Sequence, residues 1–143
     1  MALVSRVGSN QFSKRLRIRR DEFTESARRL HQQAALAGLE AMVFNTRIDT
    51  SKAVSNWIVT RGALSREIIP PYVPGKFGST GAASQAAALA FGRAEIEDYD
   101  PATDGDLFIT NNVPYLRYID GSTITALAQQ ASRAVLAGAK LFK

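Results

Sequence analysis

The sequence predicts an α+β fold in which a small mixed or antiparallel sheet packs with three helices. Apolar residues recur at three- and four-residue spacing in three separate stretches, as they do along one face of a helix. Two short runs, NWIVTRGAL (56–64) and GDLFITNN (105–112), have the composition and alternation of strands instead. A chain of 143 residues can bury one hydrophobic core, so we expect a single domain.

The N-terminal residues 1–20 are predicted to be a basic arm or edge strand. This arm has six basic residues and no acid, whereas the other 123 residues carry 12 bases and 13 acids, a net charge of −1. Phe12, Leu16 and Ile18 largely alternate with basic residues, a pattern typical of a half-exposed strand. The arm is either a solvated edge, a contact to an acidic face of a neighbouring subunit, or a contact to nucleic-acid phosphates. The candidate residues for such contacts are Lys14, Arg15, Arg17, Arg19 and Arg20.

Residues 21–143 are expected to form the domain proper, beginning with a long helix from Asp21 to about residue 44. Acids in its first turn suit the helix dipole. The apolar stripe predicted to face the core consists of Phe23, Ala27, Leu30, Ala34, Ala37, Ala41 and Phe44. A second stripe, Ala35, Leu39 and Met42, contacts either another subunit or a further part of the same domain.

A short helical turn with Asp49 or Thr50 as its cap is expected next, followed by a strand that ends at Gly62. Trp57 is interpreted as a core anchor. Prolines and glycines then predict a long loop at about 68–81. Its GKFGST segment has the lysine and hydroxyl residues in the wrong order for a phosphate-binding loop, so nucleotide binding is not expected.

The C-terminal half is predicted to contain an alanine-rich helix, an acidic turn, a strand and a last helix. The alanine-rich helix begins at about Ser79, and its small residues permit close helix packing. The DYDPATDGD segment lacks the alternation of an EF-hand loop and is interpreted as a turn. After the strand, Pro114 suits a first helical position, and Ser122 or Thr123 is the expected cap of the last helix.

Composition argues against several classes of function. There is no cysteine and only one histidine, His31, which excludes disulfides and thiolate zinc sites and argues against histidine-rich metal sites. No serine lies in a Gly-x-Ser-x-Gly motif. We therefore expect no catalytic residues, no enzymatic activity, no cofactor and no metal. Neither a membrane helix nor a secretory signal is expected.

Two motifs carry a resemblance to a known family. DTSKAVSNWIV (49–59) and GDLFITNNVPYLRYIDGST (105–123) resemble segments of the neck and tail-completion (head–tail connector) proteins of long-tailed bacteriophages. The matching residues are Asp49, Thr50, Ser55, Trp57, Asn111, Asn112, Pro114, Tyr115, Asp120, Gly121 and Ser122. Ser51 stands where the family commonly has glycine, and the Gln-Ala-Pro segment that often follows the serine is absent.

The resemblance implies a structural virion protein that forms a ring in the neck and continues the DNA channel. The implied partners are other copies of the chain, the head-completion or connector protein, the tail tube or tail terminator protein, and genomic DNA in the channel. The implied location is the virion, after synthesis in the host cytoplasm. The alternative function is a nucleic-acid-binding module that uses the basic arm.

Overall fold

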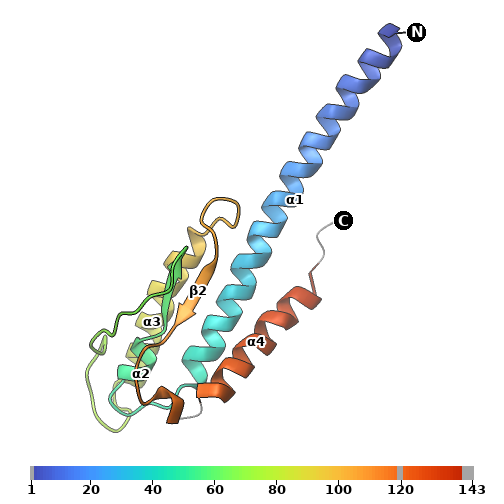
Figure 1. Cartoon of the computed structure of the whole chain (residues 1–143). Helices are drawn as coiled ribbons and strands as arrows, with labels where there is room; N and C mark the ends of the chain where they lie inside the picture. The colour runs from blue at the N-terminus through green and yellow to red at the C-terminus, as the bar shows by residue number, and fades with distance from the viewer. Residues whose placement is uncertain (1, 119–120, 140–143) are drawn as a thin grey trace.

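The computed structural model describes residues 2–118 and 121–139, and it describes side chains from residue 11 to 118 and from 122 to 139. The elements are α1 (Ala2–Asn45), α2 (Lys52–Ser55), β1 (Ile58–Arg61), α3 (Gly81–Glu97), β2 (Leu107–Thr110), the 3-10 turn η1 (Leu116–Tyr118) and α4 (Gly121–Ala137). The predicted α+β fold is confirmed: a small antiparallel sheet packs with the helices, and the N-terminal helix is the longest element (Figure 1).

The prediction of an edge strand in residues 1–20 is wrong, because residues 2–20 are the first turns of α1. Phe12 and Leu16 are four residues apart, which places them on the same side of a helix. Arginine, lysine and leucine are also good helix formers, and alternation over so few residues is compatible with both structures. Asp21, expected at the start of the helix, lies inside α1 and forms an exposed ion pair with Arg20. No break in secondary structure therefore separates residues 2–20 from the domain.

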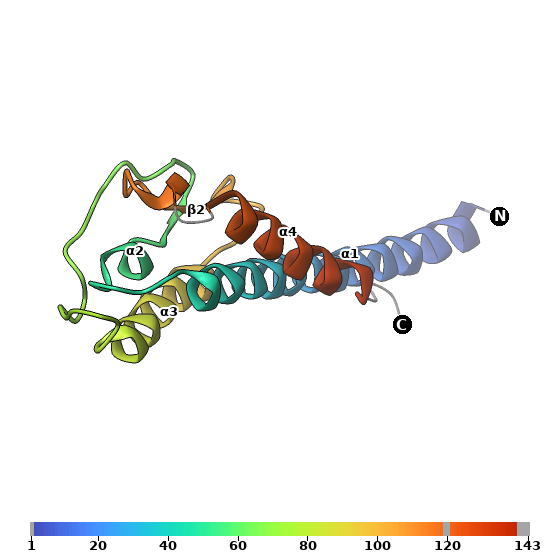
Figure 2. The same ribbon diagram turned by 90° about the horizontal axis from the view of Figure 1, so that it is seen from below.

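The buried face of α1 also differs from the predicted stripe. Leu39 and Val43 are completely buried, whereas Phe44, predicted to face the core, is 60% exposed. The reason is that the C-terminal half of α1 packs against α4 on one side and α3 on another (Figure 2), so the core lies between the two stripes. In this half of the helix, Leu39 is buried and Ala35 and Met42 pack partly against the core, whereas Phe44 is left uncovered within the chain.

A close approach of two backbones fixes α4 against α1. The Ser132 hydroxyl donates a hydrogen bond to the Ala34 carbonyl at 2.8 Å. A Cβ atom placed at Gly38 lies 2.8 Å from the same hydroxyl, so a larger residue there pushes the helices apart. Helix α4 begins at Gly121, and Ser122 and Thr123 lie within its first turn instead of preceding it as caps. Lys140 and Lys143, expected near its end, lie outside the described residues.

The sheet has two antiparallel strands, with Ile58 opposite Thr110 and Arg61 opposite Leu107. A two-stranded sheet is marginal in water without further packing. Here it lies against α3, and Gly92 brings the two together: a Cβ at Gly92 collides with the Leu39 side chain and lies 3.1 Å from Val59 Cγ2. Gly92 is thus the point at which α1, α3 and β1 meet.

The remaining predicted elements are confirmed with small shifts. The turn after α1 is α2, preceded by Ser51 and not by Asp49 or Thr50. The alanine-rich helix begins at Gly81 instead of Ser79. Trp57 is 5% exposed and belongs to the core, as interpreted. Its indole N–H donates to the Thr46 hydroxyl at 2.7 Å, which ties β1 to the end of α1.

We expect Gly92→Val to destabilise the fold by about 1–3 kcal/mol, because it overpacks a closed junction. The matched control is Ala94→Val, on an exposed position of the same helix, which we expect to cost less than about 0.7 kcal/mol through helix propensity alone. Chemical denaturation of both variants measures the difference. Equal losses contradict the assignment of Gly92 as the three-element junction.

Candidate interaction surfaces

The two family-like motifs, far apart in the sequence, meet in the structure. The Asn111 side chain at the end of β2 donates a hydrogen bond to the carbonyl of Ala53 in α2, at 2.7 Å. Tyr115 lines a cavity of about 440 Å³ together with residues 47 and 49–53. The motifs therefore form one structural unit, built where α2 leads into β1 and where β2 ends.

Polar side chains of this unit hold a long loop in place. We call residues 62–80 the display loop; it joins β1 to α3 and includes all but the last residue of the predicted loop at 68–81. The Ser55 hydroxyl accepts the Tyr72 N–H at 3.0 Å, and Asp49 Oδ1 accepts the Phe77 N–H at 2.9 Å. The Asn112 side chain donates to the Ser65 carbonyl at 2.9 Å. Three of the predicted motif residues thus act as clamps on the loop backbone.

Asn56 and Ser84 are clamps that the sequence reasoning missed. Asn56 is completely buried; its side chain both accepts from Ile69 N–H at 2.7 Å and donates to the Ile69 carbonyl at 2.9 Å. Ser84 on α3 bonds both backbone groups of Val73 in the same way. The sequence signal for these clamps is a polar residue inside an otherwise apolar element. Their backbone partners lie 11–13 residues away, and nothing in the sequence identifies those partners.

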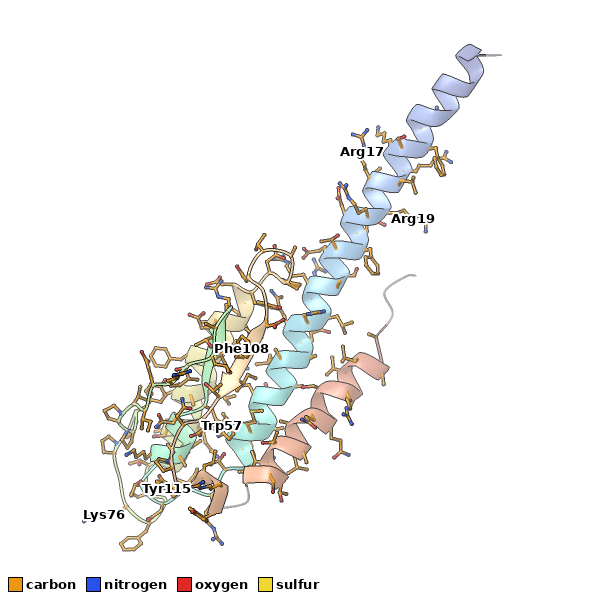
Figure 3. All side chains as sticks on the ribbon, viewed as in Figure 1. Arg17, Arg19, Trp57, Lys76, Phe108 and Tyr115 are labelled. Atoms are coloured by element: carbon orange, nitrogen blue, oxygen red, sulfur yellow. The ribbon has the colours of Figure 1, made fainter. Side chains whose placement is uncertain are left out.

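The display loop presents a phenylalanine to solvent. Phe77 is 93% exposed and has φ +54°, in the left-handed region that non-glycine residues rarely adopt. The adjoining Lys76 lies at the outer end of the loop in Figure 3, remote from the labelled Arg17 and Arg19. Strained backbone often marks functional positions, and exposed aromatic rings often anchor protein interfaces. Phe77 combines both features.

The other motif residues lie nearby or outside the described part. Asn112, Pro114 and Ser122 line a second cavity, of about 510 Å³, between the end of β2 and the start of α4. Gly121 is the first residue of α4, and Asp120 lies outside the described residues. Pro114 and Tyr115 are exposed at this end of the molecule.

The predicted basic residues lie on a part of α1 that extends beyond the rest of the molecule. We call residues 11–20 the projecting segment; Figures 1 and 2 both show it clear of the other elements. Its five basic side chains are exposed, and only Arg20 forms an ion pair with a described residue. Phe12 and Leu16 are 63% and 53% exposed. The segment is basic and apolar at once.

The acidic turn between α3 and β2 is partly neutralised. Arg61 bonds Glu95 at 3.2 Å and Asp104 at 3.3 Å. A hydrogen bond from the Asp100 N–H, together with Arg61, lowers the pKa of the Asp104 carboxyl below its ordinary value. Glu97, Asp98 and Asp106 form no ion pair with any residue in the described ranges.

Within the described ranges, no group of three or more His, Asp or Glu side chains is placed to hold a metal ion. His31 is exposed on α1 and borders a groove beside β2. None of the helices that the structure describes has the length and apolar character to cross a membrane.

Comparison with protein-family models, curated proteins and solved structures finds no match.

We expect Asn56→Ala to release the display loop, because it removes both side-chain bonds to Ile69 and leaves buried backbone groups unpaired. The expected loss of stability is about 1–3 kcal/mol. The control is Asn45→Ala, which removes one exposed side-chain bond to the Ala41 carbonyl in α1. Limited proteolysis should cut Asn56→Ala within residues 62–80 well before the control; identical cleavage patterns contradict the clamp.

Proposed function

We propose that the chain is a structural subunit of a tailed-bacteriophage neck, forming a homo-oligomeric ring that joins the capsid connector to the tail and continues the DNA channel. The observation that carries the proposal is the projecting segment, which places exposed apolar and basic side chains beyond the body of the molecule. An apolar surface of this kind in a soluble chain is characteristic of a contact with another protein.

A second surface supports assembly. In Figure 3 Lys76 of the display loop, next to Phe77 in the sequence, lies at the end of the molecule opposite Arg17 and Arg19, and hydrogen bonds hold the loop backbone there. A ring requires two different complementary patches on each subunit, because its interfaces are heterologous. Contacts to the adjoining head and tail proteins require further exposed surface along the ring axis. The projecting segment and the display loop are two separated exposed surfaces, which supports a chain that makes more than one contact.

The proposed partners follow from this assignment. They are other copies of the chain, the head-completion or connector protein on one side, and the tail tube or tail terminator protein on the other. The proposed location is the virion neck, after assembly from the host cytoplasm. The proposed role involves no bond-making step and no cofactor.

A nucleic-acid-binding module is the second candidate. It is favoured by the exposed basic side chains of the projecting segment. They lie on consecutive helical turns of α1, and residues 11–20 include no acid. Such a segment is expected to bind phosphate backbones with an affinity that falls steeply as salt rises. Gel-shift titration of the whole chain with duplex DNA at two salt concentrations tests this function directly.

The neck function is tested with particles that lack the chain. We expect such particles to accumulate as separate heads and tails in electron micrographs, and added wild-type protein to join them. Joining without the protein, or catalytic turnover by the pure chain, contradicts the proposal.

Phe77→Asn tests the display loop within the same assay. Asparagine tolerates the left-handed conformation, so we expect the free energy of unfolding to change by less than about 0.5 kcal/mol. Joining of heads to tails should fall at least tenfold, because the exposed ring is lost. Phe44→Asn removes an exposed ring from another position and should join particles as the wild type does. Equal activity of Phe77→Asn and wild type shows that the loop tip is not a contact.

A further inference from the structure

The projecting segment has an apolar side with a basic surround. Phe12 and Leu16 are four residues apart and lie on one side of α1, while Ile18 lies on a different side. The stretch from 11 to 20 contains five basic residues and no acid. A helical segment without packing partners is marginal in water, so this segment gains stability when a partner covers it.

A groove beside β2 has the complementary properties. We call it the β2 groove; its volume is about 440 Å³, His31 and Ala35 of α1 form one wall, and residues 106–109 form the other. Tyr99 lies at its end. The lining is apolar apart from His31 and Asp106, which suits the insertion of large apolar side chains from a helix.

The backbone of β2 adds hydrogen-bond acceptors to this groove. The Gly62 N–H donates to the Asp106 carbonyl at 2.8 Å, and in an antiparallel ladder alternate residue pairs exchange hydrogen bonds. Given the register of the strands, Phe108 bonds β1, while the backbone groups of Leu107 and Ile109 point away from β1. Figure 1 shows that this free edge faces α1. Arginine and lysine, which only donate, suit the exposed carbonyls.

The charges of the two surfaces are opposite. Asp106 lines the groove, and Glu97 and Asp98 belong to the adjoining acidic turn; none of the three has an ion-pair partner among the described residues. The projecting segment carries unpaired Lys14, Arg15, Arg17 and Arg19. Complementary charge of this kind sets the register and rate of association.

The two surfaces of one chain cannot meet each other. His31 and Ala35 lie on the same continuous helix as Leu16, about 22 Å and about 28 Å further along its axis at 1.5 Å per residue. A helix cannot fold back onto its own wall without breaking. The groove can therefore receive a projecting segment only from a second copy.

We propose that the projecting segment of one copy lies in the β2 groove of the next copy, with Phe12 and Leu16 inserted and the basic side chains against Asp106, Glu97 and Asp98. The contact is head-to-tail, so each copy both gives a helix and receives one. It rests on the proposed ring function for its closure, and it names the surfaces that form the ring.

A charge-swap experiment on the whole chain tests the contact. The first variant, R15E/R17E/R19E, makes the segment acidic; the second, E97K/D98K/D106K, makes the groove rim basic. Each alone places like charges at every contact, and we expect self-association in low salt to weaken at least 100-fold relative to wild type. An equimolar mixture restores opposite charges at both contacts. Native mass spectrometry should then show association of the two variants in equal numbers.

A second pair of variants tests the apolar part. F12S/L16S should abolish self-association, and the control I18S, which alters another side of the same helix, should retain it. Loss of association should be accompanied by lower helicity in circular dichroism, because the segment loses its cover.

Three outcomes overturn the proposed contact between copies. It fails if the wild type remains monomeric at about 1 mM in low salt, or if the two charge variants do not associate when mixed. It also fails if F12S/L16S associates like I18S. Loss of DNA binding in R15E/R17E/R19E without any effect on association assigns the segment to nucleic acid instead. Particles that join heads to tails normally with R15E/R17E/R19E remove this interface but leave the neck function standing. Particles that join without any copy of the chain remove the neck function itself.

Discussion

The burial of Leu39 and Val43 on α1 is the interaction on which the rest of the structure depends. These side chains are completely buried where α3 and the sheet converge, and α4 covers another side of the same helix. A two-stranded sheet has too little apolar surface to be stable alone. Its position is therefore set by the helices behind it. Gly38 and Gly92 allow this because a Cβ atom at either position collides with a neighbouring element.

The display loop, nineteen residues at 62–80, is held by both apolar and polar contacts. Tyr72 packs against the core, and its ring stacks on Phe91 of α3 with 5.0 Å between the ring centroids. The backbone groups of the loop are satisfied by side chains from the elements it spans, chiefly Asn56, Ser55 and Ser84. These clamps are buried, so their hydrogen bonds are not exchanged with water and the loop has a defined shape. Asp49, Ser55 and Asn56 of the family-like motif at 49–59 therefore fix the backbone of an exposed loop.

Features that depend on local pattern were predictable from the sequence, and features that depend on distant partners were not. Helix α3 and both strands follow from their periodicity, and Trp57 from its apolar setting. The edge strand at 1–20 was predicted wrongly because the apolar spacing from Phe12 to Ile18 fits both the two-residue period of a strand and the 3.6-residue period of a helix. No proline or glycine in this stretch distinguishes the two structures. The Asn56 clamp and the pairing of Arg61 with Glu95 join residues 13 and 34 positions apart, which only the fold brings together.

The continuity of α1 couples the core to the exposed surface. From residue 9 to residue 37 the helix contains neither glycine nor proline, the usual causes of a kink, so the projecting segment is a stiff extension of the helix that carries Leu39. Its direction is consequently set by packing about 40 Å away, at about 1.5 Å for each of the 27 residues from Phe12 to Leu39. In a head-to-tail contact, the angle between the given helix and the receiving groove decides whether successive copies close into a ring or continue as a filament. Because both surfaces belong to one rigid body, that angle is set by the core and not by a flexible linker.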